Sequence, residues 1–122
     1  MTTNTRVKAT EPEQVARLFV ERANAGDAEG VAELYEPDAV MAFPPGERTV
    51  GRAAIQGVVQ QMITHGPELT LEDGLPTLRN GDLAITATRS GDGSPGRVQV
   101  VRRQTDGSWL RVLDRPEDPH EI

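Results

Sequence analysis

The sequence predicts an α+β fold in which three N-terminal helices pack on a curved antiparallel sheet. Apolar residues recur at helical spacing as far as Gly66-Pro67, and beyond that point apolar and polar residues alternate as in strands. The second half of the sequence contains two patterns typical of β-hairpin turns, RNGD at 79–82 and TDGS at 105–108. Helices followed by antiparallel strands are typical of α+β domains, and 122 residues suit one domain.

The first two helices are predicted from their terminal residues. TEPE gives Thr10 and Glu13 the spacing of a capping box, so a helix should begin there and run to about Ala25. Asp27 is placed to cap a second, shorter helix, which Pro37 should end.

A strand over 38–43 should follow, and the PPG sequence at 44–46 forms a turn. The third helix is predicted over 51–66, because its apolar residues recur at i, i+3, i+4, i+7 and i+8. These residues are Ile55, Val58, Val59, Met62 and Ile63. Later strands are expected over 82–89, 97–105 and 108–114.

Domain organisation is expected to be simple, with a flexible N-terminus over 1–9, one domain over 10–116 and a polar C-terminal tail over 117–122. The net charge of −6, with Lys8 as the single lysine, argues against nucleic-acid binding. No apolar segment approaches the roughly 20 residues of a membrane span, and no signal-like segment is visible, so a cytoplasmic protein is predicted.

Cofactor and metal sites are not predicted. There is no cysteine, and His65 and His120 are far apart in the sequence, which argues against zinc. The GDGSPG sequence at 91–96 matches a dinucleotide-binding pattern, but it joins two predicted strands and does not precede a helix. It is therefore interpreted as a loop.

The TDGS turn predicts which side chains share a face of the sheet. A two-residue loop at Asp106-Gly107 would pair Gln99 with Asp114, Val101 with Val112 and Arg103 with Leu110 on one face. The other face would carry Val98 with Arg115, Val100 with Leu113, Arg102 with Arg111 and Gln104 with Trp109.

Apolar pairs on both faces predict that a second subunit covers the outer one. The predicted contact is a homodimer through Val100, Trp109 and Leu113. Arg102 opposite Arg111 leaves two interpretations open: an acidic residue of the partner subunit lies between them, or both side chains extend into water.

Several sequence segments, in their order along the chain, resemble those of a known family. They are VERANAGDAEGVAELYEPDAV, PPG, GRAAI, NGDLA and VVRRQTDGSWLRVLD, within residues 11–116. The chain resembles the NTF2-like superfamily, and more closely the SnoaL-like and DUF4440-type ketosteroid isomerase homologues. This resemblance implies a cone-shaped α+β barrel, a pocket between helices and sheet, and commonly a homodimer. The fold hosts isomerases, cyclases, hydrolases and non-catalytic domains, so it does not define the function.

The residues that the resemblance aligns with the isomerase machinery are apolar. Phe43 stands at the position of the catalytic base, Phe19 at that of the donor tyrosine and Val101 at that of the protonated acid. Proton transfer requires ionisable groups, so steroid isomerase activity is not predicted. The strand over 38–43 is expected to supply pocket wall.

Asp114 is the remaining catalytic candidate. A carboxylate against apolar walls on the last strand can act as a general acid or base, and several SnoaL-like proteins are expected to use this strand in that way. The alternative is a rim carboxylate paired with an arginine. Arg103 either binds a polar ligand group or covers Leu110 with its stem. Tyr35 either reaches the pocket mouth or is an ordinary helix-end tyrosine.

Two hypotheses about function therefore remain. The first is a protein that binds a small hydrophobic molecule, possessing isomerase, cyclase or hydratase-type activity with Asp114 as acid or base. The second is a non-catalytic ligand-binding, dimerisation or assembly domain. An epoxide hydrolase would need two acids around an arginine, and Arg103 with Asp114 supplies part of that set. Residues expected to line the pocket are Phe19, Met41, Phe43, Met62, Gln99, Val101, Arg103 and Val112.

Overall fold

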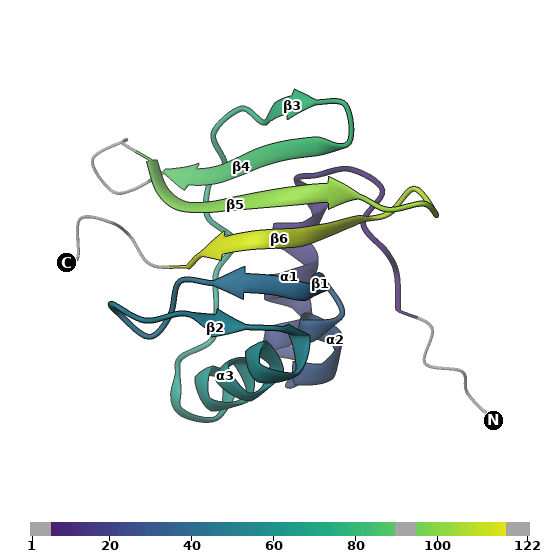
Figure 1. The fold of residues 1–122 in the computed structure, drawn as a ribbon. Helices are drawn as coiled ribbons and strands as arrows, with labels where there is room; N and C mark the ends of the chain where they lie inside the picture. Colours follow the sequence, from purple (N-terminus) through teal and green to yellow (C-terminus); the bar gives the residue numbers. More distant parts are fainter. Residues whose placement is uncertain (1–5, 90–94, 117–122) are drawn as a thin grey trace.

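A computed structural model describes residues 6–89 and 95–116 of the chain. It confirms the predicted α+β class, with helices against one face of a curved sheet (Figure 1). The elements in chain order are α1 (Gln14–Asn24), α2 (Ala28–Ala32), β1 (Tyr35–Met41), β2 (Thr49–Val50), α3 (Arg52–His65), β3 (Leu78–Asn80), β4 (Leu83–Arg89), β5 (Pro95–Arg103) and β6 (Trp109–Arg115).

The sheet has the strand order β2-β1-β6-β5-β4-β3. All neighbouring strands are antiparallel except β1 and β6, which run parallel. The prediction of an antiparallel sheet was wrong for this pair, because the chain between them runs through β2, α3, β3, β4 and β5, and so long a connection allows β6 to run in the same direction as β1. The helices contact the β2-β1-β6 half of the sheet, and β3 and β4 extend beyond them (Figure 1).

The predicted capping residue is confirmed at the start of α2 but not at the start of α1. Asp27 caps α2 as predicted, accepting a hydrogen bond from the Gly30 amide at 2.9 Å. The predicted capping box was wrong, because the Thr10 amide and hydroxyl donate to the Gln14 side chain, and Glu13 occupies the N-cap position without a side-chain capping bond. The second helix ends at Ala32, so Tyr35 opens a strand and does not close a helix.

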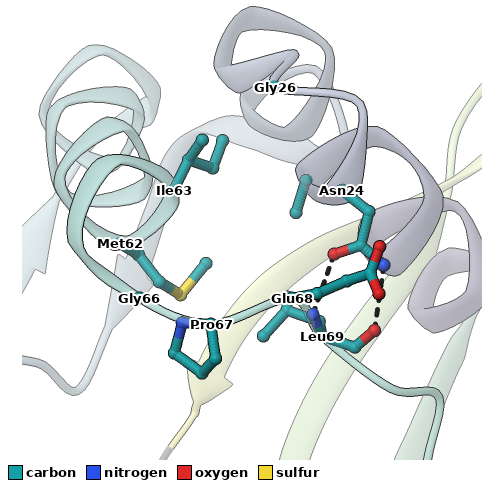
Figure 2. Close-up of a pocket in the computed structure, with 9 residues that line it drawn as sticks. Asn24, Gly26, Met62, Ile63, Gly66, Pro67, Glu68 and Leu69 are labelled. Carbon is teal, nitrogen blue, oxygen red and sulfur yellow. Dashed lines mark hydrogen bonds between the residues drawn. The ribbon is translucent and has the colours of Figure 1, made fainter.

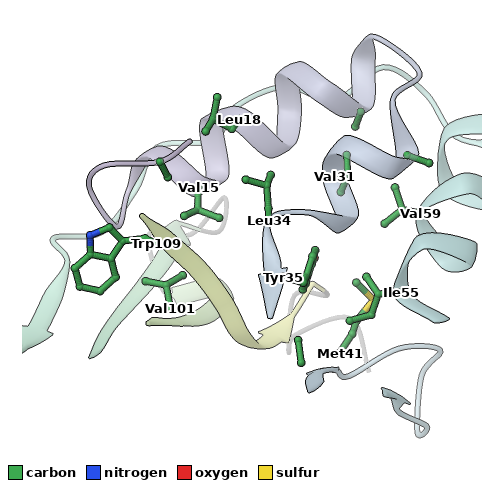
Figure 3. Packing of buried hydrophobic residues seen from close by; sticks show 14 of the residues in the cluster. Val15, Leu18, Val31, Leu34, Tyr35, Met41, Ile55, Val59, Val101 and Trp109 are labelled. Atoms are coloured by element: carbon green, nitrogen blue, oxygen red, sulfur yellow. The ribbon is translucent and has the colours of Figure 1, made fainter. Parts of the chain in front are cut away.

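The hydrophobic core lies between the helices and the inner sheet face (Figure 3). Each fully buried aliphatic side chain contributes about 1.5–3 kcal/mol relative to an exposed one. Trp109 is 1% exposed at the end of this core beside α1. The largest fully buried members are Trp109, Tyr35, Leu34, Ile55, Val15, Val31, Val59 and Val101.

The β5–β6 hairpin differs from the predicted register near its turn. The Gln104 amide donates to the Ser108 carbonyl, and Gly107 has a φ of 85°, so the loop has three residues and not two. Val101 therefore pairs with Arg111, and Arg103 with Trp109. A bulge at Val112 restores the predicted register farther along, where Val100 pairs with Leu113, Gln99 with Asp114 and Val98 with Arg115.

A one-residue shift exchanges the faces of a strand. Trp109 and Arg111 consequently point inward and are buried, which corrects their predicted outer position. The predicted Arg102–Arg111 pair does not form, and Arg102 instead bonds Glu36 at 2.9 Å. Val112 lies at the bulge and does not face Val101.

The outer face carries one apolar residue from each strand in a continuous row. Consecutive members are direct cross-strand partners, so the row crosses the sheet over about 24 Å at the usual strand spacing. Leu78 is 69% exposed and Leu113 is 49% exposed. We call these residues the outer apolar row: Val50, Val40, Leu113, Val100, Ile85 and Leu78.

Parts of the sequence predictions concern the ends of the chain and one loop. Within the predicted flexible N-terminus, Ala9 is buried and its carbonyl accepts from the Trp109 amide at 3.0 Å. The tail over 117–122, with His120, lies outside the described residues, and so do residues 91–94 of the GDGSPG sequence together with the preceding Ser90. In the described part of the chain, no helix has the length and apolar character needed to cross a membrane.

Candidate functional site

A cavity of about 350 Å³ opens between α1, the end of α3 and the inner face of β5 and β6. Its remaining wall is the extended segment 66–77, here called the strap, which connects α3 to β3. Its size falls in the lower range of small-molecule sites. The lining residues used below are Phe19, Val20, Met62, Leu69, Leu71, Glu72, Arg97, Gln99, Arg111 and Asp114.

Asp114 is a buried carboxylate on the cavity wall, 3% exposed. Its Oδ2 accepts from the Tyr35 hydroxyl at 2.5 Å and from Arg111 Nη1 at 3.4 Å. Its Oδ1 accepts from Gln99 Nε2 at 3.0 Å. A carboxylate offers about four acceptor positions. Three donors thus fix the group and leave Oδ1 able to accept one more hydrogen bond.

Tyr35 lies behind Asp114, at the start of β1, and has no exposed surface. Burial, and then the charge of Asp114, raises the pKa of the Tyr35 hydroxyl well above its ordinary value. The hydroxyl therefore stays protonated and donates to Asp114 while it accepts from Arg111 Nη1 at 3.1 Å. The Tyr35 carbonyl is held by Arg52 at 2.6 and 2.9 Å. Tyr35 is thus a positioning residue.

Arg111 is 5% exposed, and its guanidinium carbon lies 4.7 Å from the Phe19 ring centroid and 5.6 Å from that of Tyr35. Burial opposes its charge, but Tyr35 and Asp114 outweigh this effect and the pKa of Arg111 is raised. Among the residues that the structure describes, none accepts a hydrogen bond from the buried Arg111 Nε. Leaving a buried donor unpaired costs about 1–3 kcal/mol.

The strap is attached by side-chain contacts to α1 and β5 and by main-chain hydrogen bonds to β4. The Asn24 side chain donates to the Leu69 carbonyl at 2.9 Å and accepts from the Leu69 amide at 2.8 Å, and Figure 2 draws both bonds as dashed lines. Farther along, Glu72 pairs with Arg97 at 2.5 Å. Met62 and Leu69 also border a second hollow of about 230 Å³ between α1 and α3 (Figure 2). The Leu75 amide also donates to the Ala87 carbonyl at 2.8 Å, and the Arg89 amide donates to the Asp73 carbonyl at 3.0 Å, so the far end of the strap pairs with β4.

The structure brings some of the predicted site residues together. Phe19, Met62, Gln99 and Asp114 line the same cavity. Among the other predicted residues, Met41 and Val101 are buried in the core, and Phe43 packs partly buried against it.

Two predicted positions lie elsewhere. Val112 occupies the bulge of β6 and does not line the cavity. Arg103, which was expected to line the pocket, is exposed, bonds Asp82 beside the Trp109 ring and does not line this cavity. The bulge accounts for Val112, whereas Arg103 is on the same face of β5 as Gln99 but about 13 Å farther along the strand at the usual rise per residue.

Sequence reasoning missed the roles of Tyr35 and Arg111. Arg111 was assigned to the outer face because a two-residue turn was assumed. The TDG sequence, with glycine third, suits the observed three-residue loop and was an available signal. Tyr35 was assigned to a helix end, and no local pattern indicated that its hydroxyl meets a residue 79 positions away.

The chain matches one protein family over most of its length. A family model described as the SnoaL-like domain matches residues 16–113. The chain belongs to the SnoaL-like family. The SnoaL-like and NTF2-like part of the resemblance inferred from the sequence is confirmed, and the structural neighbours include NTF2-like proteins.

One curated relative and two solved structures illustrate the likeness. The relative is named epoxide hydrolase LasB, from Streptomyces lasalocidi, and is 47% identical over an alignment of 101 residues, which covers 72% of this chain and 34% of the relative. This chain thus spans about a third of that protein's length.

A ketosteroid isomerase-like protein from Erwinia carotovora atroseptica has a TM-score of 0.67 at 20% identity, covering 84% of this chain and 89% of that one. An NTF2-like protein with a cystatin-like fold from Novosphingobium aromaticivorans has a TM-score of 0.60 at 23% identity, covering 84% and 75%. These likenesses establish the fold. No group of three potential metal-ligating side chains lies together within residues 6–89 and 95–116.

Proposed function

We propose that this chain catalyses acid–base chemistry on a small apolar molecule, with Asp114 as the general base, and that the reaction is epoxide opening. The observation that carries the proposal is the buried Asp114 carboxylate on the cavity wall, fixed by Tyr35, Gln99 and Arg111. Such pre-organised groups suit proton transfer, because little rearrangement is needed during the reaction.

Water is the nucleophile in the proposed reaction. A water molecule bound to Oδ1 of Asp114 gives its proton to the carboxylate as its oxygen bonds an epoxide carbon. The C–O bond of the ring breaks, and the ring oxygen takes the electron pair. The Asp114 proton then passes to that oxygen through water, which yields a diol and regenerates the carboxylate. Neighbouring Arg111 stabilises the developing negative charge.

The name of the relative supports this choice of reaction. That protein is called an epoxide hydrolase and shares 47% identity over the aligned region. The apolar side chains of Phe19, Val20, Met62 and Leu71 suit a hydrophobic substrate. The chemistry requires no cofactor. A non-catalytic ligand-binding domain is the alternative, and the same experiment separates the two.

Replacement of Asp114 by asparagine tests the proposal. Asp114→Asn keeps the shape and removes the base, so diol formation from cyclohexene oxide should fall about 10²- to 10⁴-fold. Asp38→Asn is the matched control, because Asp38 is an exposed acid on β1 away from the cavity. Diol formation by gas chromatography and circular dichroism of both variants are the measurements. Unchanged turnover in a folded Asp114→Asn protein would contradict the proposal.

We also propose that the chain forms a homodimer through the outer apolar row. Six apolar residues, one from each strand, lie in register on a face that none of the helices in residues 6–89 and 95–116 covers. The row adjoins a hollow of about 440 Å³ over β1, β5 and β6, which can receive side chains of a second copy. A second copy would remove this apolar surface from water.

A further inference from the structure

A further hollow of about 520 Å³, here called the turn hollow, lies beside the β5–β6 turn between Arg22, Leu34, Arg52 and Trp109. The segment 6–9, the residues after α2 and the start of α3 complete its wall, at the side of the molecule where β1 begins (Figure 1). Among the described residues, none lines both this hollow and the cavity that contains Asp114. Its volume lies within the range of small-molecule sites.

The lining of the turn hollow is positively charged in an acidic protein. Each acid on the lining pairs with a cation from the segment 6–9: Glu33 accepts from Arg6 at 2.7 Å, and Asp106 accepts from Lys8 at 2.7 Å. Asp27 and Glu29 also bond Arg6 but do not line the hollow. The lining has a net charge of +2, whereas the whole chain has −6. Its charged residues are Arg6, Lys8, Arg22, Arg52, Glu33 and Asp106.

The unpaired charges belong to Arg22 and Arg52. Within residues 6–89 and 95–116, they are the only partly buried arginines that have no carboxylate within 4.0 Å. Arg22 donates to the carbonyls of Gly30, at 2.8 Å, and Val7, and Arg52 donates twice to the Tyr35 carbonyl, at 2.6 and 2.9 Å. These carbonyls hold the guanidinium groups in place without neutralising them. Burial accordingly lowers the pKa of Arg22.

An oxyanion is the ligand that would compensate these two charges. A cation that is partly removed from water is costly unless a counter-charge lies beside it. Arg52 Nη1 makes no hydrogen bond to a described residue, so it is available as a donor. Guanidinium groups bind carboxylates and phosphates through paired hydrogen bonds. Leu34 and Trp109 give the hollow an apolar side, which suits an anion with a hydrocarbon or aromatic body.

The inner cavity differs from the turn hollow in this respect. There Asp114 neutralises Arg111, and Glu72 neutralises Arg97. An anion therefore meets no unpaired cation in the inner cavity, whereas it meets two in the turn hollow. The two sites should select ligands of different charge.

We propose that the turn hollow is a second binding site, specific for a small organic carboxylate or phosphate whose oxygens bond Arg22 and Arg52 and whose apolar part contacts Leu34 and Trp109. The site goes beyond the proposed reaction at Asp114 and does not depend on it. Both anions share the chemistry that the arginines recognise, and the choice between them is made by experiment.

The fluorescence of Trp109 tests the site directly. Trp109 is the only tryptophan of the chain, and it lines the turn hollow but not the inner cavity. The probes are phenylacetate, phenyl phosphate and neutral benzyl alcohol. We expect saturable fluorescence changes with the two anions, and weaker binding of benzyl alcohol. Tighter binding of phenyl phosphate than of phenylacetate supports a phosphate ligand, and the reverse order supports a carboxylate.

Arg52→Gln should weaken binding of the preferred anion about 10- to 100-fold, as expected for the loss of a hydrogen bond to a charged group. Arg52→Lys, which keeps the charge, should recover part of this loss. Arg48→Gln is the matched control, because Arg48 is exposed and lies outside the turn hollow. Circular dichroism verifies folding. Rising salt concentration should also weaken anion binding to the wild-type protein, a test that needs no variant.

Three results would overturn the inference. The first is the absence of a saturable fluorescence change with either anion. The second is binding of benzyl alcohol as tight as that of the anions. The third is equal weakening by Arg48→Gln and Arg52→Gln, which would indicate a general effect of protein charge. Asp114→Asn should bind the anions as the wild type does, and weakening by this variant equal to that of Arg52→Gln would place the anion in the inner cavity instead.

Discussion

The two faces of the sheet depart from ordinary expectation in opposite ways. On the inner face, where apolar side chains are normal, Tyr35, Gln99, Arg111 and Asp114 form a buried polar cluster. On the outer face, where polar side chains are normal for an uncovered sheet, the outer apolar row crosses all six strands. Buried charges and exposed apolar surface both cost stability, so each indicates a function or a partner.

Strand β6 contributes to both faces, and its bulge separates them. Before the bulge at Val112, Trp109 and Arg111 point inward; after it, Leu113 points outward and Asp114 inward. Arg111 and Asp114 are three residues apart, yet the bulge brings them to the same side at 3.4 Å. A regular strand would have placed residues three apart on opposite faces.

The largest expected effect concerns the inner cluster. Arg111→Met should destabilise the protein by about 3–5 kcal/mol, because it leaves the buried Asp114 charge without its partner. Urea unfolding followed by circular dichroism gives the change in the free energy of unfolding. The control is the triple variant Tyr35→Phe, Arg111→Met and Asp114→Leu, which removes the charges together.

The triple variant should recover most of the stability and have no activity, because apolar replacements of a buried ion pair are often neutral or stabilising. This result would establish that the inner cluster is retained for function. If Arg111→Met costs less than about 1 kcal/mol, the cluster is solvated and not a desolvated ion pair.

A smaller effect is expected on the outer face, and it appears in association and not in folding. Leu113→Lys places a charge at the centre of the proposed dimer contact, so the dimer should weaken by about 2 kcal/mol, or roughly 30-fold in the dissociation constant. Val7→Lys is the control, because Val7 is exposed and apolar but lies off the row. Analytical ultracentrifugation measures both.

A wild-type protein that sediments only as a 13.2 kDa species at all concentrations would refute the dimer. Equal weakening by Val7→Lys would place the contact elsewhere. Epoxide turnover in the Leu113→Lys variant should stay close to wild type, since Leu113 does not line the inner cavity.

The smallest effect concerns the turn that determines which residues face each side. Gly107 has a φ of 85°, so Gly107→Ala should cost about 1–2 kcal/mol in unfolding free energy through left-handed strain. Gly57→Ala is the matched control, because this helical glycine has open space around it and a Cβ favours the helix. If Gly107→Ala costs nothing in thermal denaturation, the three-residue loop does not constrain the hairpin.

Local sequence patterns predicted much of the fold. The helical spacing from Ile55 to Ile63 predicted α3, and Asp27 predicted the start of α2. The RNGD turn predicted the β3–β4 hairpin, whose Asn80 and Leu83 pair across it. These features depend on neighbouring residues and on backbone preferences, which a sequence displays directly.

Tertiary structure decided which side chains meet. The sequence by itself determined the α+β class, the family resemblance, the apolar character of Phe19 and the candidacy of Asp114. The association of Tyr35 with Asp114 depends on the parallel pairing of β1 and β6, which joins segments 79 residues apart. The inward direction of Arg111 depends on one extra loop residue and one bulge. Because side chains alternate along a strand, a register shift of one residue places Arg111 on the cavity wall and not on the outer face.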